Sequence, residues 1–141
     1  MEKVIFLDVD GVLNTGNTID REGLHAVCEE RVKILKKIVF ATKADLVLSS
    51  TWRLYKDASQ VLRERLQRFG MDFVDRTDDL WKKPRSHEIL EWLSRHQEVK
   101  QFAIIDDDED AEVKGSFFLT TFETGLTHDV AERVIEHLNA A

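Results

Sequence analysis

Short apolar segments alternate with amphipathic ones along this chain, and this alternation limits the possible folds more than any other feature of the sequence. The apolar runs have the length and the β-branched or aromatic content of buried strands, and apolar residues recur at helical spacing between them. Strands that alternate with helices form parallel sheets covered on both faces, joined by right-handed crossovers. We therefore predict an α/β protein with about five parallel strands. The expected strands cover residues 4–7, 44–49, 71–74, 101–105 and 116–121, and the expected helices cover 30–42, 54–69, 84–93 and 130–138.

Single residues mark several of the expected helix ends. Gly70 follows the second helix, as glycine often does at a helix C-terminus. Pro84 suits the first turn of the third helix, and Thr127 or Asp129 is the expected cap of the last one. Residues 14–30 are rich in Asn, Thr and Gly and have no sustained period, so we predict a functional flap or small cap there.

Size, composition and charge narrow the class of protein. The 141 residues suit one domain spanning 1–141, and 43% hydrophobic with 33% charged residues is a globular balance. The single cysteine, Cys28, suits a reducing compartment, and no apolar stretch approaches the roughly 20 residues that span a bilayer. We therefore expect a cytoplasmic protein without membrane contact. A net charge of −7 argues against tight non-specific binding of a polyanion, although a local basic pocket could hold a small phosphorylated group or a nucleic-acid end.

Polar clusters follow three of the expected strands directly. Asp8 and Asp10 follow the first, residues 49–51 (Ser-Ser-Thr) follow the second, and residues 106–108 (Asp-Asp-Asp) follow the fourth. Ligands of parallel α/β sheets gather beyond the carboxyl ends of the strands, so these clusters predict one shared site. In extended chain Asp8 and Asp10 would face the same side, where two carboxylates at about 4 Å repel by roughly 4 kcal/mol. Such a pair favours a bound cation.

The same clusters resemble the sequence motifs of the haloacid dehalogenase (HAD) superfamily of phosphatases and phosphotransferases. DVDGV at residues 8–12 matches the first motif, DxDx[VT], and Leu48-Ser49 matches the second. Lys83-Pro84 resembles the third, and residues 105–107 resemble the fourth in its paired-acid form. FLDVDGVLN, LSSTWR and the late Gly125-Leu126-Thr127 resemble, more narrowly, the small HAD domain of Swiss Army knife RNA-repair proteins. The resemblance implies a single Rossmann-like, HAD-type domain with a minimal cap.

The resemblance also implies roles for individual residues. Asp8 would be the nucleophile that forms an aspartyl-phosphate, and Asp10 the general acid and then the general base. Ser49 would hydrogen-bond the phosphoryl oxygens, and Lys83 would neutralise the phosphoryl group. Mg²⁺ is the implied cofactor, because carboxylates and carbonyls suit it. Its implied ligands are Asp8, the backbone carbonyl of Asp10, Asp106 and Asp107.

Several assignments stay open in the sequence. Lys82 and Arg85 compete with Lys83 for the third-motif role, and Arg85 is also a candidate substrate-binding residue. Backbone N–H groups of Ser50 and Thr51 are expected to help bind phosphate. Trp52 and Arg53 either recognise a base and a second phosphate, or pack in the core and pair with a carboxylate. Trp81 and Trp92, like Leu90, are expected to pack.

The expected function is that of a phosphatase with an open site. A cap as small as residues 14–30 favours a bulky substrate, and the subfamily resemblance points to a nucleotide or an RNA or DNA end, with repair enzymes as possible partners. A protein phosphatase and a non-catalytic HAD module that binds a partner are the alternatives, since a fold alone does not determine a substrate.

Overall fold

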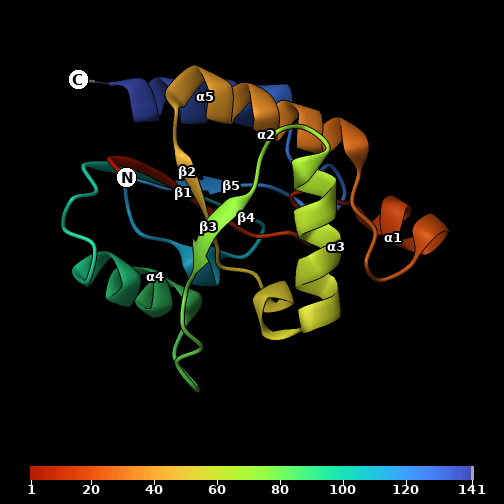
Figure 1. The fold of residues 1–141 in the computed structure, drawn as a ribbon, viewed down its shortest axis with the longest axis horizontal. Coiled ribbons are helices and arrows are strands. Elements are labelled where there is room, and N and C mark those ends of the chain that lie inside the picture. Colours follow the sequence, from red (N-terminus) through yellow and green to blue (C-terminus); the bar gives the residue numbers. More distant parts are fainter. Residues whose placement is uncertain (141) are drawn as a thin grey trace.

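A five-stranded parallel sheet forms the centre of the computed structural model, which describes residues 1–140 (Figure 1). The strand order is β3-β2-β1-β4-β5, and every neighbouring pair is parallel. This confirms the α/β class and the parallel sheet predicted from the alternation. The strands are β1 (Lys3–Leu7), β2 (Asp45–Leu48), β3 (Phe73–Arg76), β4 (Gln101–Asp106) and β5 (Phe117–Leu119).

Helices cover both faces of the sheet, as Figure 1 shows. Helices α2, α3 and α5 pack on one face, and α4 packs on the other. No helix among residues 1–140 has both the length and the apolar character that crossing a membrane requires. The helices are α1 (Gly16–Glu22), α2 (Glu29–Thr42), α3 (Lys56–Gln67), α4 (Arg85–Ser94) and α5 (His128–Asn139), with short 3₁₀ helices η1 (Thr51–Leu54) and η2 (Glu109–Ala111).

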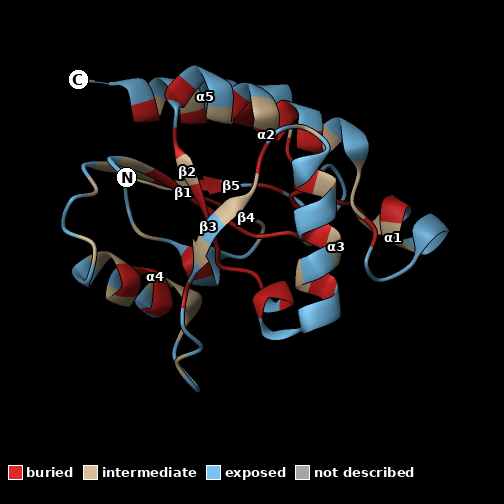
Figure 2. Cartoon of the chain, in the orientation of Figure 1, coloured by how far each residue is buried: buried red, intermediate tan, exposed pale blue. Residues whose placement is uncertain are grey.

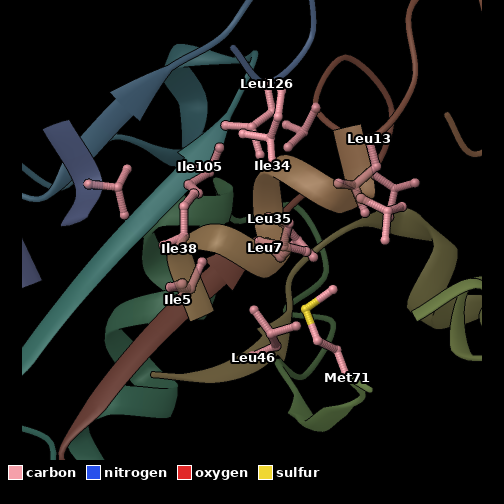
Figure 3. Close-up of a cluster of buried hydrophobic side chains, with 14 of the residues drawn as sticks. Ile5, Leu7, Leu13, Ile34, Leu35, Ile38, Leu46, Met71, Ile105 and Leu126 are labelled. Atoms are coloured by element: carbon pink, nitrogen blue, oxygen red, sulfur yellow. The ribbon is translucent and has the colours of Figure 1, made fainter. Parts of the chain in front are cut away.

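Strand β1 contributes side chains to the cores on both faces, because successive residues of a strand point to opposite sides. Ile5 and Leu7 belong to the larger cluster beneath α2, α3 and α5, shown in Figure 3. Val4 and Phe6 belong to the smaller cluster beneath α4, where Phe6 meets the Trp92 ring edge-on at 5.4 Å between centroids. Figure 2 shows the result as buried central strands between helices that are buried on one side only.

The structure corrects several local expectations. The helix predicted over 54–69 is α3 (Lys56–Gln67), residue 54 belongs instead to the separate helix η1, and β3 begins at Phe73 rather than at residue 71. Thr127 caps α5 by accepting a hydrogen bond from the Val130 N–H. The segment 14–30 contains α1 and leads into α2.

Two apolar residues expected to pack are exposed instead. Leu90 is 47% exposed, because α4 turns Ile89 and Trp92 towards the sheet and leaves Leu90 outside. Trp81 is 79% exposed, because it precedes α4, in a segment between β3 and α4 that extends away from the sheet (Figure 1).

Candidate active site

The carboxyl ends of the three central strands bring the predicted site residues together. Leu7 of β1 pairs with Leu48 of β2 and with Ile105 of β4, so the next residue of each strand lies at the same edge. The backbone continues this pairing, because the Asp8 N–H donates to the Ile105 carbonyl (3.1 Å) and the Ser49 N–H donates to the Leu7 carbonyl (3.0 Å). Asp8, Ser49 and Asp106 are therefore neighbours, as the strand-end clusters predict.

Three carboxylates meet at this edge. Asp8, Asp106 and Asp107 each offer an oxygen, and these oxygens lie within 4.8 Å of one another. Asp8 and Asp106 are buried, and Asp107 is half-buried. Burial, together with the nearby Asp106 carboxylate, raises the pKa of Asp8 well above its ordinary value, and burial also raises the pKa of Asp107. A largely buried cluster of hard oxygen ligands is suited to a divalent cation, which would offset the repulsion among the carboxylates.

Arg85 is the cation that contacts this cluster. One of its guanidinium nitrogens, Nη1, lies 3.4 Å from Asp8 Oδ1 and 2.9 Å from Asp106 Oδ2. Pro84 is the N-cap of α4, so Arg85 is the first helical residue, and its N–H donates to Asp110 Oδ2 (2.9 Å). Lys83, the residue chosen from the sequence, precedes the helix and is exposed. The geometry therefore favours Arg85 over Lys83 for the third-motif role.

Asp10 lies beyond the end of β1, and its carboxylate is held apart from the three clustered carboxylates. Its Oδ2 accepts a hydrogen bond from Trp52 Nε1 (3.2 Å), and its Oδ1 accepts one from Asn14 Nδ2 (2.9 Å). The chain turns at Gly11, whose φ of 79° favours glycine and whose N–H donates to Asn14 Oδ1 (3.0 Å). The two aspartates of the first motif are thus placed in different surroundings.

Ser49 presents an unsatisfied hydroxyl at the same edge. Its Oγ is fully buried and has no hydrogen-bond partner among residues 1–140, a state it shares with the Thr77 hydroxyl. Buried polar atoms nearly always have partners, so an orphaned hydroxyl beside a carboxylate cluster is typical of a ligand-binding position. Ser50 uses its hydroxyl to cap η1, where it accepts from the Trp52 N–H (3.1 Å), and Thr51 is exposed at the start of η1.

A comparison with protein families matches residues 4–131 to the family described as "HAD domain in Swiss Army Knife RNA repair proteins". The chain belongs to this family. Neither the curated proteins nor the solved structures that were compared gave a match. Membership confirms the HAD-type resemblance and supports, in the broad sense, a phosphatase-type hydrolase.

Trp52 and Arg53 of this HAD domain face inward. Each is only 4% exposed. The Arg53 guanidinium donates to Glu88 Oε2 (3.0 Å), to the Ser50 carbonyl (2.8 Å) and to the Thr77 carbonyl (2.9 Å). This is the second of the two alternatives that the sequence left open, in which the pair packs and binds a carboxylate. The arrangement argues against direct substrate contact by Arg53, because its guanidinium is buried and all three of its nitrogens donate to groups inside the chain.

Sequence reasoning missed three residues that support the site of this HAD domain. Asn14 connects the Asp10 carboxylate to the turn at Gly11 and to the Ala26 carbonyl (2.9 Å). Glu88 holds Arg53 and the Leu80 N–H (2.9 Å), and the Thr120 hydroxyl donates to the Gly11 carbonyl (2.6 Å). Asn14 ends the FLDVDGVLN segment and could have been noticed there, whereas no local pattern distinguishes Glu88 or Thr120 from surface residues.

Proposed function

We propose that this HAD domain is a Mg²⁺-dependent phosphomonoester hydrolase that forms an aspartyl-phosphate at Asp8 and acts on the phosphorylated ends of RNA or DNA. One observation carries the proposal. The buried Asp8 carboxylate lies beside two further carboxylates and contacts the Arg85 guanidinium. Asp8 follows β1, and the neighbouring strand β2 leads to Ser49, whose hydroxyl has no hydrogen-bond partner among residues 1–140.

The donor set fits Mg²⁺. Asp8, Asp106 and Asp107 supply carboxylate oxygens within 4.8 Å of one another, and the Asp10 carbonyl would complete the protein ligands. When bound, Mg²⁺ supplies positive charge that neutralises the carboxylates and polarises the phosphoryl oxygens. Arg85 alone cannot balance three carboxylates and a phosphate dianion, so a second cation is required on electrostatic grounds.

The proposed chemistry has two displacements at phosphorus. In the first, an Asp8 carboxylate oxygen attacks phosphorus while the bond from phosphorus to the ester oxygen breaks, and Asp10 donates a proton to that leaving oxygen. In the second, Asp10 removes a proton from a water molecule that attacks the same phosphorus, and the bond to Asp8 breaks to release inorganic phosphate. Trp52 and Asn14 hold the Asp10 carboxyl in place for both proton transfers.

Arg85 and Ser49 would stabilise the charge that moves during these steps. Arg85 offers donors that already lie against Asp8, and a guanidinium binds phosphoryl oxygens well. Ser49 would donate its free hydroxyl to a phosphoryl oxygen and so gain the partner that it lacks. Both groups are in place before substrate binds, so little rearrangement is needed.

The substrate class rests on the family and on the small cap. The family description names RNA repair proteins, and the segment between β1 and α2 carries only the seven-residue helix α1. An open edge suits a polynucleotide end better than a small metabolite. Repair enzymes as partners and a cytoplasmic location also stay predictions, the first from the family resemblance and the second from the composition of the sequence.

Hydrolysis of 4-nitrophenyl phosphate with and without Mg²⁺ tests the proposal most directly. We expect Mg²⁺-dependent turnover that EDTA abolishes, and a loss of about 10³-fold or more in Asp8→Asn, because removal of a nucleophile usually costs at least that much. Wild-type activity in Asp8→Asn would refute the nucleophile assignment, and no turnover of any ester would indicate a binding module instead.

A substrate panel then tests the class of substrate. It compares oligonucleotides with a 3′- or 5′-phosphate, mononucleotides, phosphopeptides and sugar phosphates under the same conditions. We expect the highest kcat/KM for a phosphorylated oligonucleotide. Activity on phosphopeptides but not on oligonucleotides would indicate a protein phosphatase, and a preference for sugar phosphates would contradict the repair function.

A further inference from the structure

An exposed tryptophan lies in the segment that leads into the site. Of the three tryptophans, Trp52 and Trp92 are buried, whereas Trp81 is 79% exposed. It lies in a turn at residues 80–83, which we call the Trp81 turn. Figure 2 shows the segment between β3 and α4 as mostly exposed. An exposed indole offers a flat apolar face on which an aromatic ring of a ligand can stack.

The Trp81 turn is closed by one internal hydrogen bond and joined to α4 by another. The Lys83 N–H donates to the Leu80 carbonyl (2.8 Å) and closes the turn, and the Leu80 N–H donates to the buried Glu88 Oε2 (2.9 Å). Lys82 has a φ of 64°, a left-handed conformation that is uncommon for lysine. The turn therefore presents Trp81 on an anchored backbone, which reduces the entropy lost when a ligand stacks on it.

The turn is also close to the proposed chemistry. Trp81 precedes Arg85 by four residues, so their Cα atoms are at most about 15 Å apart. The Arg85 guanidinium lies 3.4 Å from Asp8 Oδ1. At about 3.4 Å per stacked nucleotide, a few nucleotides would cover this distance from a terminal phosphate at Asp8.

Local charge favours an anionic ligand over a neutral one. Lys82 and Lys83 are exposed cations beside Trp81 in a chain whose net charge is −7, whereas the Arg85 guanidinium is already paired with Asp8 and Asp106. The Lys82 Nζ lies 5.8 Å from the centroid of the Trp81 ring, so an ammonium group and an indole are presented together. Aromatic platforms combined with cations are the usual means of binding single-stranded nucleic acid, because every base has a stacking face and every linkage has a charge.

We propose that the Trp81 turn binds the nucleotides next to the phosphorylated end, with Trp81 stacking on a base and Lys82 contacting the backbone phosphate. This inference deepens the proposed function and rests on it for the position of the terminal phosphate at Asp8. It assigns the recognition of the strand to Trp81, one of the two tryptophans that the sequence analysis expected to pack, and not to Trp52.

The test compares a substrate that has a strand with one that has none. Trp81→Ala should lower kcat/KM for a phosphorylated ten-residue oligoribonucleotide about tenfold, mostly through KM, and leave 4-nitrophenyl phosphate hydrolysis unchanged. Trp81→Phe keeps an aromatic face and should retain most of the activity. Lys82→Gln should reduce the dependence of log K on log salt by about 0.7, the share of one phosphate contact on a single strand. An equal loss on both substrates in Trp81→Ala would overturn the inference, because it would indicate a structural role.

Two exposed side chains elsewhere serve as matched controls. Phe40, 59% exposed near the end of α2, controls for loss of an exposed aromatic group. Arg63 lines a hollow of about 940 Å³ between α3 and β3, which is the alternative place where an oligonucleotide could bind. Phe40→Ala and Arg63→Ala should both keep full activity on the oligonucleotide. A loss in Arg63→Ala without one in Trp81→Ala would overturn the inference in favour of the hollow.

Binding measured without turnover separates this inference from the proposed function. In an Asp8→Asn background with Mg²⁺, fluorescence anisotropy of a labelled, phosphorylated oligoribonucleotide should show about tenfold weaker binding when Trp81→Ala is added. Trp81-dependent binding by a wild-type chain that hydrolyses no ester would refute the proposed function and retain the binding site. Aryl-phosphate hydrolysis without Trp81-dependent binding would refute the site and retain the function.

Discussion

Replacing Asp8 with asparagine is expected to stabilise the metal-free domain, although it removes the proposed nucleophile. Asp8 is repelled by Asp106 and Asp107, whose oxygens lie within 4.8 Å of its own. With an effective dielectric near 20, each pair of ionised groups costs at least about 3.5 kcal/mol, or about 7 kcal/mol together. The Arg85 nitrogen at 3.4 Å offsets about 5 kcal/mol of this. The ionised Asp8 side chain therefore destabilises the metal-free fold by about 2 kcal/mol, and desolvation adds to this cost.

The sign of the pH dependence follows from the raised pKa. Burial and the Asp106 carboxylate raise the pKa of Asp8 in the folded state, so the folded chain binds more protons than the unfolded chain above about pH 4. The free energy of unfolding of the metal-free wild type should therefore fall as pH rises from about 4 to that raised pKa. Asp8→Asn lacks this titrating group, so the amount by which its free energy of unfolding exceeds that of the wild type should be small at pH 5 and largest at pH 8.

Urea unfolding in EDTA measures this difference, with Asp20→Asn as the control. Asp20 is exposed on α1, so its substitution should change the free energy of unfolding by less than about 0.5 kcal/mol. Mg²⁺ should reverse the order of stabilities, because it binds the folded wild type and neutralises the cluster. The electrostatic reasoning is refuted if Asp8→Asn in EDTA at pH 8 is no more stable than Asp20→Asn.

Two further predictions concern the neighbours of Asp8. Gly11→Ala should destabilise the domain by at least about 1 kcal/mol and weaken activation by Mg²⁺, because the φ of Gly11 is 79° and an added Cβ would clash with the Asp107 carboxylate. Titration of activity against Mg²⁺ measures the effect. An unchanged midpoint of that titration would contradict the prediction. Arg85→Ala should lower kcat for 4-nitrophenyl phosphate by about 10²-fold or more, because the Arg85 guanidinium contacts Asp8, whereas Lys83→Ala should change kcat less than twofold. The reverse result would assign the third-motif role to Lys83.

Much of the fold could be predicted because the information lies in local periodicity. Apolar runs such as residues 4–7 and 103–105 are buried on both faces of the sheet, and burial of this kind requires uninterrupted apolar side chains. The boundaries were less well predicted. Residues 51–54 form a separate 3₁₀ helix because Ser50 caps it through its own hydroxyl, a contact that helical periodicity does not encode.

The sequence by itself determined which strands end in polar clusters, and a parallel sheet then has to bring those ends to one edge. Asp8, Ser49 and Asp106 meet for this reason, and no long-range detail was needed to expect it. Only the tertiary structure decided which cation serves that edge. Lys83 and Arg85 are two residues apart, and the start of α4 at Pro84 directs one of them to Asp8 and leaves the other exposed.

The tertiary structure also decided which tryptophans are free to bind. Trp52 lies only three residues after Ser49, the proposed phosphate-binding serine, yet it is buried, and its indole N–H donates to Asp10, which follows a different strand. Trp81, in contrast, lies exposed on a turn whose Leu80 N–H donates to Glu88. Burial depends on contacts between segments far apart in the chain, and for that reason the amino-acid pattern alone could indicate the edge of the proposed active site but not the surface around it.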